Sequence, residues 1–171
     1  MAEAKQQDAI ALLKADHRKV EELFSQFEET KGAKTKQKLA EQICMELKIH
    51  TIIEEEIFYP ACEGKIEEDL LEEAYVEHDA AKVLIGEIEE GSPDEEFYDA
   101  KVKVLKEEIE HHVQEEEKRM EGMFAQARKA GLDMDMLGEE LAARKQQLMS
   151  LYQEGGQLPV KLSTMPDQPA P

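Results

Sequence analysis

The feature that most constrains the fold is the placement of four histidines on the apolar faces of four successive helix-like segments. Each histidine recurs with apolar residues at spacings of three and four, the periodicity of one face of an α-helix. Two of them are followed four residues later by a glutamate on the same face. A buried imidazole or carboxylate costs free energy unless it is bonded, so six such groups are hard to satisfy by packing alone. The six are His17, His50, Glu54, His78, His112 and Glu116.

The same periodicity predicts an all-α protein, because no segment shows the alternation of a β-strand. Short breaks separate four predicted helices, over roughly 4–30, 35–62, 66–90 and 93–130. For the last of these, Ser92 is the predicted N-cap and Glu95 completes a capping box. Four helices with short connections favour an up-down-up-down four-helix bundle over residues 1–131. In such a bundle the four histidines lie near the helix centres, at comparable depth.

Two further segments follow the predicted bundle. Residues 132–154 form an additional amphipathic helix with an apolar stripe of Met134, Leu137, Leu141, Leu148 and Tyr152. We expect this helix to pack outside the bundle or against a partner chain, with a landing surface on the second helix at Met45, Ile49 and Ile52. Residues 155–171 have the composition of a disordered tail.

Helix phase distinguishes the candidate residues from their neighbours. His111 and Glu115 have the same spacing as His112 and Glu116, but they point nearly the opposite way around the helix. We therefore expect His111 to be exposed and the acidic runs around Glu54 and Glu116 to be mostly solvated.

Composition limits the partners and the compartment. The formal net charge of −19 argues against nucleic acid or an anionic membrane as a partner. No apolar run is long enough to span a bilayer, and the N-terminus lacks a signal-peptide core. Cys44 and Cys62 have no metal-ligand spacing and are expected to be reduced thiols. These features predict a cytoplasmic protein, either a monomer or a homodimer.

The residue types in the predicted centre indicate a metal. One histidine on an apolar face is more often a hydrogen-bonded core residue, but the pattern recurs on four helices. Imidazole and carboxylate ligands suit Fe, Mn or Zn, and the missing thiolates exclude the usual structural zinc sites. Four histidines and two glutamates are too many for one open tetrahedral site. They suit a dinuclear site bridged by carboxylates inside a helix bundle.

The motifs resemble the hemerythrin-like (HHE cation-binding) family over about residues 8–130. The segments that carry the resemblance are LKADH ending at His17, HTIIEEEIFYP from His50, EHDAAKVLI around His78, and HHVQEEE around His112. The resemblance implies a four-helix bundle with a non-haem diiron centre. It also implies that His17 and His50 bind one iron, that His78 and His112 bind the other, and that Glu54 and Glu116 bridge them.

Two departures from the oxygen-carrying members bear on function. Lys82 stands where those proteins have a fifth histidine, and Glu116 replaces an aspartate found one residue further on. The second metal therefore has one protein ligand fewer, which weakens the case for reversible O₂ transport. We expect Lys82 to face the bundle and either to reach the open metal position or to extend past it to solvent.

The leading hypothesis is a diiron protein that binds or reacts with O₂, peroxide or NO. Mn and Zn remain alternatives to iron. Two other functions stay open: a redox enzyme, such as one that decomposes peroxide, and a metal or redox sensor whose fifth helix meets a partner.

Overall fold

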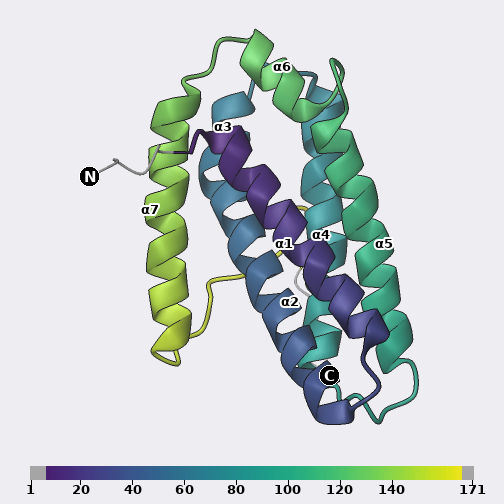
Figure 1. Cartoon of the computed structure of the whole chain (residues 1–171). Coiled ribbons are helices and arrows are strands. Elements are labelled where there is room, and N and C mark those ends of the chain that lie inside the picture. Colours follow the sequence, from purple (N-terminus) through teal and green to yellow (C-terminus); the bar gives the residue numbers. More distant parts are fainter. Residues whose placement is uncertain (1–6, 167–171) are drawn as a thin grey trace.

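The structure is a computed structural model that describes residues 7–166, and every regular element in that range is helical. The body consists of four long helices, α1 (Ala9–Glu29), α2 (Ala33–Ile53), α4 (Glu68–Glu90) and α5 (Tyr98–Glu117). They run alternately up and down in Figure 1, and contacts of α1 and α4 with both α2 and α5 close the ring. The predicted all-α bundle is confirmed. None of the helices in 7–166 combines the length and apolar character needed to cross a membrane.

Shorter elements complete the chain. A π-helical turn, η1 (Glu54–Phe58), and a short helix, α3 (Tyr59–Cys62), continue α2. Two more helices follow the bundle, α6 (Met123–Lys129) and α7 (Met134–Gln153). The first helix was expected from about residue 4, but residues 4–6 lie outside the described part. In the structure Asp8 caps α1 by accepting a 2.8 Å hydrogen bond from the N–H of Ala11.

The core is divided into two apolar layers. One lies toward α3, α6 and α7 and includes Leu13, Ile53, Phe58, Ala74 and Met123. The other lies toward the opposite end and includes Val20, Leu47, Ala81, Ile85 and Leu105. On each of α1, α2 and α4, the candidate histidine lies between an apolar residue of the first layer and an apolar residue of the second. His112 Nε2 lies 3.2 Å from His78 Nε2, so all four histidines lie at one depth, and apolar side chains separate that depth from both ends of the bundle.

The fourth predicted helix differs from the expected 93–130 at its start. The helix begins at Tyr98, and Ser92 does not cap it. Its carbonyl instead accepts the N–H of Glu95 in a turn, and Phe97 has a left-handed φ of 69°. A residue with positive φ cannot belong to a right-handed helix, so the helix starts after Phe97 and the residues before it form turns.

A second break at residues 118–122 ends α5 and sets α6 apart. Gly122 permits it, because a Cβ there would lie 2.5 Å from the carbonyl oxygen of Lys118. The break changes which side chains face inward. A continuous helix over 93–130 would place Met120 on the face of His112 and Glu116, but Met120 is 81% exposed, whereas Met123 and Phe124 are buried.

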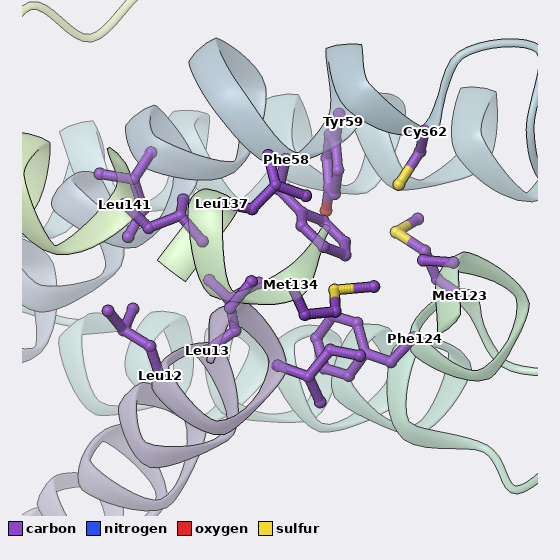
Figure 2. Close-up of a cluster of buried hydrophobic side chains, with 14 of the residues drawn as sticks. Leu12, Leu13, Phe58, Tyr59, Cys62, Met123, Phe124, Met134, Leu137 and Leu141 are labelled. Carbon is purple, nitrogen blue, oxygen red and sulfur yellow. The ribbon is translucent and has the colours of Figure 1, made fainter. Parts of the chain in front are cut away.

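The additional helix α7 packs on the outside of the bundle against α1, α2 and η1 (Figure 1). Leu137 and Leu141 lie beside Leu12 and Leu13 of α1 in Figure 2. Met45, Ile49 and Ile52 belong to the same cluster, as the expected landing surface requires. Of the predicted stripe, only Tyr152 is exposed. The bundle itself thus covers the predicted stripe of α7, except at Tyr152.

The segment after α7 was expected to be a disordered tail, yet its described part follows a defined path back across α4. Backbone N–H groups of Ser163, Thr164 and Met165 all donate to the buried carboxylate of Asp79. Polar composition does not reveal this path, because backbone donors bind a buried carboxylate while Leu158 and Val160 pack against the apolar core. Residues 167–171 lie outside the described part of the chain.

Candidate metal centre

The structure brings together all six residues that the sequence singled out. His17 comes from α1, His50 from α2, Glu54 from η1, His78 from α4, and His112 and Glu116 from α5. Their exposed fractions range from 0% for Glu54 to 5% for His50. The Nε2 atoms of all four rings and the oxygens of both carboxylates converge between the two apolar layers.

The donor atoms form two groups that share both carboxylates. In the first group, His50 Nε2 lies 3.2 Å from Oε1 of Glu54, and His17 Nε2 lies 3.2 Å from Oε2 of Glu116. In the second, His78 Nε2 lies 3.1 Å from the other oxygen of Glu54. His112 Nε2 lies 3.2 Å from the other oxygen of Glu116. Each glutamate therefore presents one oxygen to each group, as a bridging carboxylate does.

A fifth side chain, Tyr59, enters the second group. Its hydroxyl lies 2.8 Å from Oε1 of Glu116, 3.0 Å from Nε2 of His78 and 3.2 Å from Nε2 of His112. The sequence reasoning did not identify this residue. Tyr59 follows Glu54 by five residues, which in an α-helix would place it well away from the face of Glu54.

The π-helical turn explains how Tyr59 reaches the centre. In η1 the N–H of Tyr59 bonds to the carbonyl of Glu54, five residues back, so the two side chains share a face. Pro60 follows immediately and has no N–H to continue an α-helical ladder. Such single π turns occur frequently at functional sites.

A second layer of carboxylates surrounds the histidines. Each Nδ1 atom faces one carboxylate from a different segment. The carboxylate lies on α1 for the α2 histidine, on η1 for the α4 histidine, on α4 for the α5 histidine, and on α5 for the α1 histidine. The pairs are His50 with Asp16 at 3.2 Å, His78 with Glu55 at 3.0 Å, His112 with Glu77, and His17 with Glu117 at 3.8 Å. In the first three pairs, which are within hydrogen-bond distance, the carboxylate keeps the proton on Nδ1 and turns the Nε2 lone pair toward a metal. Glu55 and Glu117 belong to runs that were expected to be solvated, and only the packing of neighbouring helices identifies them.

The electrostatics of the centre favour positive charge. Burial by itself lowers the pKa of His50, but Glu54 and Asp16 outweigh it and raise that pKa to about 10. Burial also lowers the pKa of His112, and Glu116 and Glu77 raise it well above its ordinary value. Burial and Glu116 act to raise the pKa of Glu54, yet His50 and His78 hold it at about 2. In the metal-free protein, protons therefore supply the positive charge that metal ions would otherwise bring.

Three unsatisfied atoms test whether the residues fit a metal. Oε1 of Glu54, Oε2 of Glu116 and Nδ1 of His17 are buried without a hydrogen-bond partner among the described residues. The two oxygens are the ones that belong to the first donor group. Buried acceptors without partners are costly in a protein core, and a cation between them removes that cost. The donor set therefore fits metal binding.

The neighbouring residues behave differently from the six. His111 is exposed and lies 3.4 Å from Glu77, as helix phase predicted. Lys82 is buried and faces the bundle, but it neither approaches the donor atoms nor extends to solvent. Its Nζ binds Glu55, Asp79 and the carbonyl of Lys161, at 2.8–3.2 Å. Lys82 faces the bundle as expected, but neither expected position of its ammonium group is observed, because the half-buried Glu55, the buried Asp79 and a carbonyl bind it instead.

Comparisons with known proteins agree with the helical fold and with cation binding. The model of the hemerythrin HHE cation binding domain matches residues 8–124. The crystal structure of a hemerythrin HHE cation binding domain-containing protein from Mycobacterium kansasii matches with a TM-score of 0.72 and 23% identity. That match covers 88% of this chain and 95% of the other, and it shows the shared fold.

A curated relative is similar over a smaller part of its own length. A DNA nickase of Nostoc sp. is 29% identical over 106 residues, which make up 62% of this chain but only 30% of that protein. The match to the domain model spans more than half of the present chain and contains all six candidate residues. The resemblance inferred from the motifs is confirmed: this chain belongs to the hemerythrin HHE cation-binding family.

Proposed function

We propose that this protein holds a non-haem diiron centre that binds or reacts with O₂, peroxide or NO. The observation that carries the proposal is the division of Glu54 and Glu116 between two histidine pairs. A single ion would need only one oxygen from each glutamate. Two ions use all four oxygens, and a helix bundle with facing Glu and His residues is an established setting for such a pair.

The donor chemistry supports iron as the metal. The centre offers imidazole nitrogens, carboxylate oxygens and one phenol oxygen, with no thiolate among the described donors. This set suits iron and manganese, while zinc in protein sites usually takes fewer ligands. Iron, when bound, supplies one-electron redox chemistry and a coordination position for a small ligand.

The surroundings of the centre limit the size of that ligand. The six candidate residues are almost fully buried, and apolar layers close the bundle on either side of them. Lys82 adds no ligand to the second histidine pair, because its ammonium group binds Glu55, Asp79 and the carbonyl of Lys161. A diatomic molecule or peroxide is of a size that such a centre can admit.

Anaerobic titration with Fe²⁺, followed by exposure to air, tests the proposal. We expect about two iron ions per chain, as a dinuclear bundle site requires, and the absorption of an oxygen-bridged iron pair after oxidation. Elemental analysis of freshly purified protein distinguishes iron from manganese and zinc. Binding of far fewer ions, or a colourless oxidised protein, would overturn the proposal.

A second candidate function is enzymatic decomposition of peroxide at the same centre. The observation that favours it is the Tyr59 hydroxyl among the donor atoms, because peroxide chemistry needs a group that holds or moves a proton. Burial, together with Glu116 and Glu54, raises the pKa of Tyr59 well above its usual value, so it keeps its proton. Sustained peroxide turnover by the iron-loaded protein, lost in His78→Ala, would establish the enzyme. Absence of turnover would leave a binding protein.

A further inference from the structure

The outer carboxylates of the centre are themselves held by a third layer of side chains. Every acid that faces a histidine Nδ1 also contacts a basic side chain. The pairs are Glu117 with Arg18, Glu77 with His111, Asp16 with Lys145, and Glu55 with Lys82. Two of these four acids are reached from the C-terminal region, which lies beyond the residues matched by the family model.

The first of these connections runs from α7 to His50. Lys145 donates to Oδ1 of Asp16, while Oδ2 of the same carboxylate lies 3.2 Å from Nδ1 of His50. Asp16 is buried, with 6% of its surface exposed. Because each oxygen has one partner, the Lys145 contact fixes the orientation of the carboxylate and, through it, the plane of the His50 ring.

The second connection runs from the C-terminal segment to His78. The Ser163 hydroxyl donates a 2.8 Å hydrogen bond to Oε2 of Glu55, whose Oε1 lies 3.0 Å from Nδ1 of His78. The carbonyl of Lys161 accepts from Lys82 at 2.8 Å, and Lys82 also binds Glu55. The segment thus contacts Glu55 directly and through one lysine.

The segment is anchored where it makes this contact. Asp79, which is fully buried, accepts the N–H groups of Ser163 at 2.9 Å, Thr164 at 2.6 Å and Met165 at 3.0 Å. The Thr164 hydroxyl donates to the same carboxylate at 2.7 Å. A carboxylate that receives several N–H bonds holds the backbone closely, so the position of Ser163 is determined by α4 itself.

We propose that the C-terminal region, residues 134–165, positions the two metal sites separately, with Lys145 acting on His50 and Ser163 acting on His78. The inference rests on the proposed function, since it requires a centre that holds two ions. Carboxylates that bind the second nitrogen of a metal-ligand histidine orient the ring and raise its basicity. Here the carboxylates are oriented in turn by a region outside the bundle.

Anaerobic Fe²⁺ binding in single-site backgrounds tests this proposal. His78→Ala leaves the pair His17 and His50, and His50→Ala leaves the pair His78 and His112. We expect Lys145→Gln to weaken Fe²⁺ binding about tenfold in the His78→Ala background, the lower end of the effect of outer ligand partners. Lys145→Gln should leave the Fe²⁺ affinity of the His50→Ala background unchanged. The double variant Ser163→Ala/Thr164→Pro should show the opposite pattern.

Two further variants separate positioning from general stability. Arg144→Gln breaks the ion pair of the adjacent α7 residue with Glu56, which binds no histidine, and should leave Fe²⁺ binding unchanged in both backgrounds. Lys145→Arg preserves the cation and should restore wild-type affinity. Equal weakening of both sites by Lys145→Gln, or an effect of Arg144→Gln as large, would overturn the proposal.

A second measurement uses the chain with all six candidate residues intact, in case a single-site background does not fold. In the Zn²⁺-loaded, ¹⁵N-histidine-labelled protein, Nδ1–H signals report the hydrogen bond of each ring. Lys145→Gln should shift the His50 signal alone, and the Ser163→Ala/Thr164→Pro variant should shift the His78 signal alone. Unshifted signals would contradict the inference. Failure of the wild-type chain to bind two ions would instead contradict the proposed function.

Discussion

The Tyr59 hydroxyl donates a 2.8 Å hydrogen bond to Oε1 of Glu116 across the buried centre. The two residues are 57 positions apart in the chain, one after the π turn and the other on α5. The bond places a protonated phenol among the donors of the second histidine pair. The π turn that follows α2 thus brings Tyr59 into contact with a candidate metal ligand on α5.

Replacement of Tyr59 by phenylalanine should leave the fold intact and lower the stability of the metal-free protein by about 1 kcal/mol, the usual net value of one hydrogen bond. The aromatic ring would keep its contacts with Phe58 and Tyr75. Urea unfolding measures the change. Tyr75→Phe, which removes a hydroxyl outside the centre, is the matched control and should have no measurable effect. Equal losses in the two variants would contradict the role of the Tyr59 hydroxyl.

Substitution of a shared glutamate should affect both metal positions. Glu54→Gln replaces a carboxylate that serves both histidine pairs, so we expect iron content to fall from about two ions to below one per chain. Glu115→Gln changes a residue of the same type on the other face of α5 and should retain full iron content. Elemental analysis after anaerobic loading measures both variants. Retention of one tightly bound ion in Glu54→Gln would show that the carboxylate serves a single site.

The metal-free protein should lose stability as the pH rises above neutrality. Because the folded pKa of His50 is raised to about 10, its contribution is complete below the ordinary histidine pKa of 6.5 and disappears as pH approaches 10. Glu54, with a folded pKa of about 2, contributes fully above 4.5 and loses its contribution as pH falls toward 2. The metal-free protein is therefore expected to be most stable between pH 4.5 and pH 6.5, the ordinary pKa values of glutamate and histidine.

Urea unfolding of chelator-treated protein from pH 5 to 9 checks this dependence. In the pH range where a histidine is protonated in the folded state but neutral in the unfolded state, the free energy of unfolding should fall by about 1.4 kcal/mol per pH unit. Metal should reverse the trend, since ligation requires neutral histidines and releases their protons. Stability of the metal-free protein that increases from pH 7 to 9 would contradict the assignment.

Lys82→Met should destabilise the protein by about 3 kcal/mol, as expected when one partner of a buried ion pair is removed. The change leaves Glu55 and the buried Asp79 without their cation. Urea unfolding of the metal-free variant measures this loss. Lys101→Met removes a lysine whose ion pair with Glu87 lies at the surface, and it should cost less than about 1 kcal/mol.

Gly138→Ala should weaken the docking of α7 by about 2 kcal/mol. A Cβ at Gly138 would lie 2.5 Å from the carbonyl oxygen of Gln7 and 2.9 Å from the backbone nitrogen of Ala9. Gly86→Ala in α4 is the matched control, because a Cβ there meets no atom within 4 Å. That change should stabilise the helix by about 0.5–1 kcal/mol. Thermal unfolding compares the two, and equal shifts would show that α7 does not depend on the close approach.

Much of the fold and the inner site could be predicted, because both depend on helical periodicity. The spacing of His112 and Glu116 with Leu105 and Ile109 selects one face of α5 and leaves His111 outside. That selection requires only the number of residues per turn of an α-helix, which does not depend on contacts with other segments. The same local reasoning failed at Ser92 and Met120, where backbone turns with positive φ interrupt an apparently continuous pattern.

The remaining features depend on which segments meet. The sequence alone determined the helical class, the six candidate residues and their common depth. Tertiary structure decided the π turn that brings in Tyr59, the outer carboxylates and the capture of Lys82 by Glu55 and Asp79. It also decided the path of residues 161–165, whose backbone N–H groups find a buried carboxylate on α4. Periodicity fixes where a side chain points, but a hydrogen-bond partner on another segment is fixed only when the helices pack.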